Sequence, residues 1–389
     1  LSLDWILYYV LMVIIDFGYL SIMWQNVKGM WIGKNYDLIA QEDIDVKNER
    51  DIVDGTQHMN ANADVKAPPA LIAKGLVKKF SRSFAAVKGV SFQVAQGECF
   101  GLLGVNGAGK TTTFRMLTGD EIPTSGEASI LNFNLDKDRT KYLMQTGYCP
   151  QYDSINETLT GEEMLTLFAL LRGIRPKGAK FQVNNWINLL GLEEYRNRLC
   201  GSYSGGNKRK LCTAIALIGD PPVVFLDEPT SGVDPISRRN LWDVLARSQK
   251  SGQAVVLTSH SMEECEALCT RLTILVQGRM MCIGSTQYIK QKYGQGYTVL
   301  IKLFSDLTTI TTLNQLKTAM YNIFSINCVL KDEHTGLLHY HLTDSNIALS
   351  TIFEALEKLK LKYNIIEDYT ISDTTLEQVF IAFAKQAHH

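Results

Sequence analysis

The chain has 389 residues, of which 46% are hydrophobic, so it is long enough for two or three domains with a sizeable core. Its 39 basic and 40 acidic residues give a net charge of −1, which argues against nucleic-acid binding driven by general electrostatics. Eight cysteines are scattered without a C-x-x-C pair, which favours reduced thiols over a metal site. The chain begins with Leu1, and we expect it to be part of a longer protein.

Residues 5–24 are almost all apolar, and about twenty such residues suffice to span a bilayer. Aromatic residues cluster at both ends, and Lys28 and Lys34 follow, which places the C-terminal side in the cytoplasm. We therefore expect residues 1–24 to be the last transmembrane helix of a domain whose other helices lie upstream or in another chain. Asp16 should face those helices, because it would be costly against lipid. A buried helix of a soluble domain is the alternative.

Residues 25–69 are polar with mixed charges, and we interpret them as a surface linker with room for one short helix. From residue 70 to 296, unbroken apolar strands alternate with helices, which predicts a parallel sheet covered on both faces. Strands are expected at 71–77, 86–94, 98–103, 223–226 and 254–258. Helices are expected at 113–118, 160–171, 180–190, 208–218 and 238–248. Thr160 and Glu163 match a capping box at the start of one of these helices.

Residues 297–389 have a different sequence pattern, with short expected strands in which apolar and polar residues alternate, and no cluster of catalytic residue types. The expected elements lie at 297–303, 313–324, 326–330, 337–342, 346–360 and 365–370, with a last helix at 375–385. Their β-α-β-β-α-β order is the ferredoxin-like arrangement. We therefore expect a small regulatory or interaction domain.

Residues 104–112 fit the phosphate-binding pattern G-x-x-x-x-G-K-[ST], between an expected strand and an expected helix. Glycines let the backbone turn several N–H groups toward one phosphate, and the helix start adds partial positive charge. Lys110 offers a cation to the outer phosphates, and Thr111 offers a hydroxyl to Mg²⁺. A glycine-rich turn with a chance lysine is the alternative. The predicted nucleotide-binding residues here are Gly104, Asn106, Gly107, Ala108, Gly109, Lys110, Thr111 and Thr112.

Asp227 and Glu228 end an expected strand, where ligand groups gather in sheets of this kind. Asp227 can hold Mg²⁺, and Glu228 can orient and deprotonate an attacking water. A surface acidic pair would look the same, so this signal is weak alone. Ser204, Gly205, Gly206 and Asn207 open a helix and predict a second anion-binding end, with a flexible loop as the alternative.

Three further residues are single candidates whose ordinary structural roles remain open. His260 follows the strand at 254–258, where it could contact a γ-phosphate instead of being a surface or structural histidine. Gln151 could reach Mg²⁺ or the attacking water, or be a solvated loop residue. Phe80 could stack on adenine, or pack in the core.

Taken in order, these segments resemble the motif set of ATP-binding-cassette ATPases. The matching stretches are 104–112 (Walker A), Gln151 (Q-loop), 204–207 (signature), 223–228 (Walker B), 231–234 (D-loop) and His260 (H-loop). Within that family, residues 203–211 and 257–265 look like the second nucleotide-binding domain of A-subfamily lipid transporters. Residues 379–383 resemble the C-terminal motif of their regulatory domain.

The resemblance implies an α/β P-loop ATPase core with a helical subdomain, preceded by one transmembrane helix and followed by a ferredoxin-like domain. It implies ATP and Mg²⁺ as cofactors, with Thr111, Asp227 and Gln151 serving the metal. Glu228 would be the base, His260 would hold the γ-phosphate, and Phe80 and Asp234 would complete the nucleotide site.

The resemblance also implies partners. Two such domains close head to tail, so Ser204–Asn207 would act on the nucleotide of a second cassette, in the first half of the same transporter. Upstream transmembrane helices and a lipid or sterol would be the other partners, with no nucleic acid. Both domains after residue 69 would be cytoplasmic parts of a multi-pass membrane protein.

Departures and alternatives accompany this interpretation. Tyr203 and Asn207 replace the commoner Leu and Gln of the signature, Gly232 replaces Ala, and Phe80 replaces Tyr. We expect retained activity with altered affinity. The alternatives are a soluble cassette acting on ribosomes or DNA, a transporter of a non-lipid substrate, and a P-loop GTPase. The last would need a guanine-reading Asn-Lys-x-Asp, which the sequence lacks.

Overall fold

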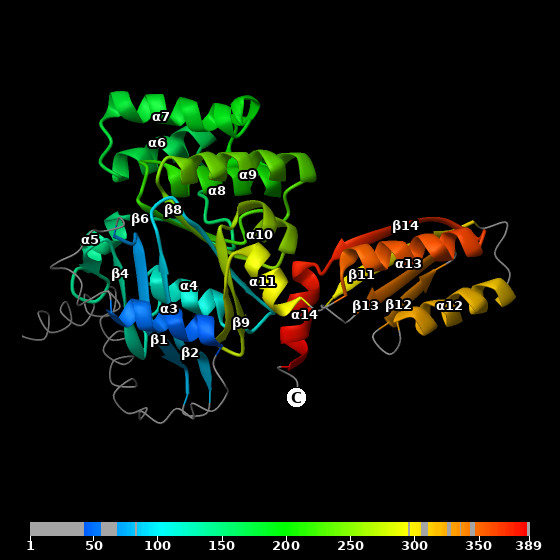
Figure 1. The fold of residues 1–389 in the computed structure, drawn as a ribbon. Coiled ribbons are helices and arrows are strands. Elements are labelled where there is room, and N and C mark those ends of the chain that lie inside the picture. Colours follow the sequence, from blue (N-terminus) through cyan, green and yellow to red (C-terminus); the bar gives the residue numbers. More distant parts are fainter. Residues whose placement is uncertain are drawn as a thin grey trace, which may run out of the picture. The chain divides into compact units, whose positions relative to one another are not determined.

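The computed structural model describes residues 43–55, 68–81, 84–294, 296–304, 310–324, 328–334, 336–342 and 347–386. The chain divides into two compact units, with the boundary between Thr286 and Gln287 (Figure 1). The expected transmembrane stretch, residues 1–24, lies outside the described residues. Among the helices that are described, none has both the length and the apolar character needed to cross a bilayer.

The first unit is built on a sheet whose six described strands follow the order β10-β9-β3-β8-β7-β6. Their bounds are β3 (Cys99–Gly104), β6 (Thr146–Cys149), β7 (Val223–Asp227), β8 (Ala254–Ser259), β9 (Arg271–Val276) and β10 (Arg279–Gly284). All neighbours pair in parallel except β9 and β10, which pair antiparallel. The strands β3, β7 and β8 are buried from end to end, which explains their unbroken apolar sequences.

A second, antiparallel sheet of the same unit has the order β2-β1-β4-β5. Its strands are β1 (Leu71–Lys79), β2 (Ala85–Val94), β4 (Ser125–Ile130) and β5 (Phe133–Asn134). The helix α4 (Lys110–Leu117) contacts strands of both sheets. The rings of Phe92 and Phe100 stack with their centroids 4.7 Å apart, so one hydrophobic core joins the two sheets through α4.

The remaining helices of the first unit connect or cover these strands. They are α5 (Arg139–Met144), α6 (Gly161–Leu171), α7 (Pro176–Leu189), α8 (Gly205–Leu217), α9 (Pro235–Lys250) and α10 (Met262–Leu268), with 3₁₀ turns at Glu193–Tyr195 and Cys200–Ser202. The next helix, α11 (Thr286–Tyr293), begins at the boundary and otherwise belongs to the second unit. The helix α6 packs on α7 and α8, and these helices lie between β6 and β7 in the chain (Figure 1). The capping box predicted at Thr160 and Glu163 is confirmed. The helix α7 begins at Pro176, earlier than expected, because proline suits the first helical turn.

The helix α3 (Ile44–Gly55) lies inside the range interpreted as a linker, yet it packs on β1, β2 and β10. Its residues Val46 and Val53 are buried. The buried Glu49 accepts hydrogen bonds from Arg271 Nη2 at 2.6 Å and from a backbone N–H of β2 at 3.1 Å. Polar composition hid this packing, because only one narrow stripe of the helix faces the core.

The second unit contains an antiparallel sheet with the order β12-β13-β11-β14. Its elements are β11 (Tyr297–Leu303), α12 (Ile310–Phe324), β12 (Cys328–His334), β13 (Leu337–Leu342), α13 (Leu349–Lys362), β14 (Ile366–Asp373) and α14 (Leu376–Gln386). Alternate residues of β11 and β13 are buried in one core with α12 and α13, so both helices cover the same face of the sheet.

Candidate functional site

The predicted site residues follow the carboxyl ends of neighbouring parallel strands. The strands β3, β8, β7 and β6 lie side by side, so residues far apart in the sequence reach one edge of the sheet. At this edge stand Lys110 after β3, His260 after β8, Asp227 and Glu228 at the end of β7, and Gln151 after β6.

The phosphate loop joins β3 to α4 in a shape that only glycine permits. Gly109 precedes α4 with a φ of 102°, and a Cβ there would lie 2.6 Å from the carbonyl oxygen of Ala86. A Cβ at Gly104 would lie 2.7 Å from the carbonyl oxygen of Leu275. Residues 105–107 of the loop are exposed. The loop therefore packs against the protein on one side and is open to a ligand on the other.

Lys110 is buried at the start of α4, with its amine folded back into the loop. Its Nζ donates to the carbonyl oxygens of Gly104 at 2.6 Å and Val105 at 3.3 Å. Burial lowers the pKa of Lys110, while Glu228 and Asp227 act in the opposite direction. Thr111 and Thr112 are half-buried beside it. The loop therefore gathers a cation, backbone amides and hydroxyl groups at one helix start.

Asp227 is a nearly inaccessible carboxylate at the end of β7, only 2% exposed. The hydroxyl of Thr258, on the adjacent β8, donates to its Oδ1. Burial raises the pKa of Asp227, whereas the hydrogen bond from Thr258 and the nearby cations Arg209 and Lys110 lower it. A carboxylate held this way is well suited to charge compensation by a bound cation.

Glu228 follows directly in a left-handed backbone conformation, with a φ of 50° that is uncommon for a residue with a side chain. Its N–H donates to the carbonyl oxygen and to Oγ1 of Thr258, both at 3.1 Å. Its Oε1 lies 3.4 Å from Nδ1 of His260, whose side chain is 66% exposed. The pair lines a cavity of about 280 Å³ with residues 230–232 and 259–261. The roles predicted for Glu228 and His260 stay predictions.

The signature segment starts α8 with a side-chain cap. Ser204 Oγ accepts from the N–H of Asn207 at 3.3 Å, and Ser204 and Gly205 are exposed while Asn207 is buried. Asp234 caps α9 by accepting from the Ser237 N–H at 2.9 Å, which lowers the pKa of Asp234. Ser204 and Asp234 thus each cap the start of a helix, α8 and α9 respectively.

Two family models match the chain. One, described as "ABC transporter", matches residues 87–231. The other, described as "ABCA1-like, C-terminal R1 regulatory domain", matches residues 294–373. The chain belongs to the A subfamily of ATP-binding-cassette proteins. The family predicted from the motifs is thereby confirmed.

The curated relatives of this A-subfamily chain are much longer than it is. Phospholipid-transporting ATPase ABCA3 of Homo sapiens is 47% identical over 348 residues, which are 89% of this chain and 20% of that protein. Retinal-specific phospholipid-transporting ATPase ABCA4 of Bos taurus is 43% identical over 390 residues, or 99% of this chain and 16% of that protein. The chain thus spans about a fifth or less of these relatives.

Solved structures support the cassette fold of the first unit. An ATP-binding subunit of an ABC transporter has a TM-score of 0.55 and 28% identity, over 58% of this chain and 93% of that one. A dimeric ATP-binding cassette in a post-hydrolysis state, bound to ADP and Pi, has a TM-score of 0.51 and 23% identity, over 55% of this chain and 98% of that one. The predicted α/β P-loop core is confirmed at the level of the fold.

Phe80, the predicted adenine-stacking residue of the cassette, is 48% exposed just after β1. Its ring stacks on that of Phe84 with centroids 6.3 Å apart, and Lys78 Nζ lies 5.4 Å from its centroid. Phe80 is thus not packed in the core, and its stacking on adenine stays a prediction.

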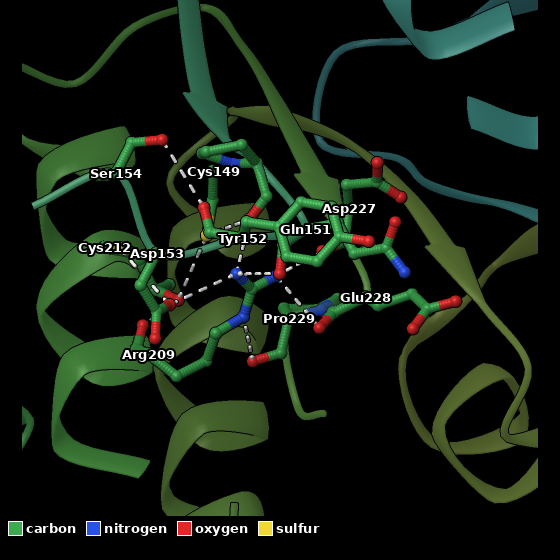
Figure 2. Close-up of polar contacts among 12 residues, drawn as sticks. Cys149, Gln151, Tyr152, Asp153, Ser154, Arg209, Cys212, Asp227, Glu228 and Pro229 are labelled. Atoms are coloured by element: carbon green, nitrogen blue, oxygen red, sulfur yellow. Dashed lines mark hydrogen bonds and ion pairs between the residues drawn. The ribbon is translucent and has the colours of Figure 1, made fainter. Parts of the chain in front are cut away.

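One residue that touches this site escaped the sequence reasoning. Arg209 lies in the second turn of α8, is 2% exposed, and hydrogen-bonds to the carbonyl oxygens of Asp227 and Glu228 (Figure 2). Arg209 stands between Lys208 and Lys210, so the sequence does not distinguish it from its neighbours; its burial does, because a buried charge needs partners.

Proposed function

We propose that this chain is an ATP-binding and ATP-hydrolysing cassette that drives lipid movement across a membrane. The observation that carries the proposal is the gathering of Lys110, Asp227, Glu228, Gln151 and His260 at one edge of the parallel sheet. The match to the ABC transporter family supports ATP hydrolysis by these residues. The contact between Glu228 and His260 indicates where in the site hydrolysis would take place.

In this proposal the phosphate loop and Lys110 bind the phosphates of ATP, with Phe80 stacking on the adenine. Lys110 would exchange its bonds to loop carbonyls for phosphate oxygens, which are stronger, charge-assisted acceptors. Glu228 accepts a proton from the attacking water, because its carboxylate opens into the cavity it shares with His260. His260 donates to the γ-phosphate from its exposed position.

The residues present fit a Mg²⁺ ion. Thr111, Asp227 and Gln151 offer a hydroxyl, a carboxylate and an amide oxygen, which are the hard ligands that Mg²⁺ prefers. The raised pKa of the buried Asp227 indicates a carboxylate short of positive charge, which a divalent cation would supply. When bound, the ion neutralises phosphate charge during transfer.

The partner in this proposal is a second cassette, in the first half of the same transporter. The exposed Ser204 and Gly205 present the start of α8 outward, where a nucleotide held by another cassette would meet the helix N-terminus. Asp234, in the D-loop, would lie at the same junction. The relative whose solved structure carries ADP and Pi is described as dimeric, which supports this arrangement.

The substrate and the setting complete the proposal. The curated relatives are named phospholipid-transporting ATPases, which supports a lipid over a non-lipid substrate and over a role on ribosomes or DNA. We place the chain in a multi-pass membrane protein with upstream transmembrane helices and both units in the cytoplasm. The strand order β12-β13-β11-β14 supports a ferredoxin-like regulatory domain for residues 297–389.

The test is ATP turnover by the full-length transporter in liposomes of defined lipid composition. We expect Mg²⁺-dependent ATP hydrolysis that rises when a transported phospholipid is present and is lost in Lys110→Ala. Turnover stimulated by RNA or DNA, and indifferent to lipid, would refute the lipid proposal and support the soluble alternative.

A further inference from the structure

Arg209 is a buried cation whose N–H groups all lie near backbone oxygen atoms. Its side chain is 3% exposed, although it carries a permanent charge. Guanidinium has five N–H donors in one plane, so burial is tolerated only when those donors are satisfied. Figure 2 shows the group surrounded by carbonyl oxygens of two loops.

The partners of Arg209 come from the ends of β6 and β7. Its Nε donates to the Pro229 carbonyl oxygen at 3.2 Å, and its Nη2 donates to those of Glu228, at 2.9 Å, and Asp227. Its Nη1 donates to the carbonyl oxygens of Pro150 and, at 3.4 Å, of Gln151. The carboxylate of Asp153 lies 3.7 Å from Nη1. One side chain of α8 therefore holds both the Q-loop and the segment that follows Walker B.

These hydrogen bonds hold the Glu228 peptide from one side, and Thr258 holds it from the other. Thr258 accepts the Glu228 N–H, while Arg209 donates to the Glu228 carbonyl oxygen. A left-handed backbone is costly for a residue with a side chain and persists only where its surroundings fix it. The two contacts supply that constraint and so set the direction in which the Glu228 carboxylate leaves the backbone.

We propose that Arg209 is a positioning residue that couples α8 to the Glu228 carboxylate. Ser204 caps the start of α8, so a displacement of that end is passed through Arg209 to the segment around Glu228. In a two-cassette assembly, the partner's nucleotide would meet the start of α8. Arg209 would then link that nucleotide to Glu228, the proposed general base of this chain's own site. The inference rests on the proposed function, because it takes Glu228 as the base.

The first test needs no ATP turnover. Hydrogen exchange of the full chain is compared between Arg209→Gln and the matched control Lys208→Gln, which removes a neighbouring cation of the same helix. Lys208 pairs instead with Glu157 at 2.8 Å. We expect the amides of Glu228 and Ser231 to exchange at least about tenfold faster in Arg209→Gln, because their local opening becomes easier. The control should leave them unchanged. Equal exchange in the two variants would overturn the proposal.

The second test uses turnover in the assembled transporter. Arg209→Gln should lower kcat about 10- to 100-fold, the scale expected when a reacting group is misplaced. ATP affinity should stay within about threefold, because ground-state contacts of the phosphate loop are retained. Arg209→Lys keeps the charge but not the planar fork, so it should be intermediate.

A double-substitution cycle separates positioning from a general loss of structure. In a Glu228→Gln background, Arg209→Gln should add no further loss of kcat, since its effect is transmitted through the Glu228 carboxylate. The same fold loss in both backgrounds would overturn the proposal. A parent transporter that neither binds nor hydrolyses ATP would refute the proposed function itself, while the exchange comparison would still report on the Arg209 contacts. If Arg209→Gln does not fold, Arg209→Lys carries the same comparisons.

Discussion

Replacement of Glu228 by Gln should separate ATP binding from ATP hydrolysis. Glutamine has nearly the size of glutamate but cannot accept a proton from water, and removal of a general base typically costs about 10²–10⁴ in rate. The backbone hydrogen bonds that hold residue 228 do not involve its side chain, so its conformation should persist. Among the described residues, the side chain's close polar contact is with the largely exposed His260, whose Nδ1 lies 3.4 Å from Oε1, so the substitution disturbs few contacts.

The expected variant is therefore folded, binds ATP-Mg²⁺ as tightly as the parent, and turns it over about 10²–10⁴ times more slowly. If ATP holds two cassettes together, the variant should also show ATP-dependent association that persists while that of the parent decays. Single-turnover hydrolysis measures the rate, and sedimentation in ATP-Mg²⁺ measures the association. Parental turnover in Glu228→Gln would remove Glu228 from the mechanism, and weak ATP binding would assign it to the metal site instead.

Three other substitutions test other parts of the structure. Lys110→Ala should abolish productive ATP binding in a fluorescence titration, since it removes the cation that the loop holds; unchanged affinity would mean that ATP binds elsewhere. The raised pKa of Asp227 means that its ionisation opposes folding, so this contribution to stability falls as pH rises above the ordinary carboxyl pKa. Asp227→Asn should then be more stable than the nucleotide-free parent at neutral pH while losing Mg²⁺-dependent turnover; a destabilised variant in thermal melts would contradict this. Glu49→Gln should lower the free energy of unfolding by about 2 kcal/mol, because it removes a charged partner of the half-buried Arg271, and urea denaturation that gives no change would exclude that contact as stabilising.

The parts of the site that could be predicted from sequence are those formed by contiguous residues. The phosphate loop needs glycines at Gly104 and Gly109 because of local backbone contacts, and so it leaves a regular pattern. Glu228 and His260 were placed in one site because each follows an apolar strand, and parallel strands end at a common edge. Their strand order, with β8 between β3 and β7, is a tertiary property that no local pattern encodes.

The contacts that were missed are long-range and involve backbone acceptors. Arg209 donates hydrogen bonds to carbonyl oxygens, which every residue has. The side chains of Pro150 and Pro229 therefore give no sequence signal for the contact. The packing of α3 was hidden for a related reason. Its partner Arg271 lies 222 positions further along the chain, and neither residue of the pair belongs to a recognisable motif.

The docking of α3 changes where this cassette begins as a folding unit. A fragment cut at residue 70, where the strands of the cassette motif start, would lose Glu49 and leave Arg271 with one of its two carboxylate partners, Glu98. It would also uncover the parts of β1, β2 and β10 that α3 packs against. A fragment that starts at Asp43 keeps these contacts. The helix α3 is therefore part of the folded cassette, and the stability of both sheets depends on a segment that lies outside the cassette motifs.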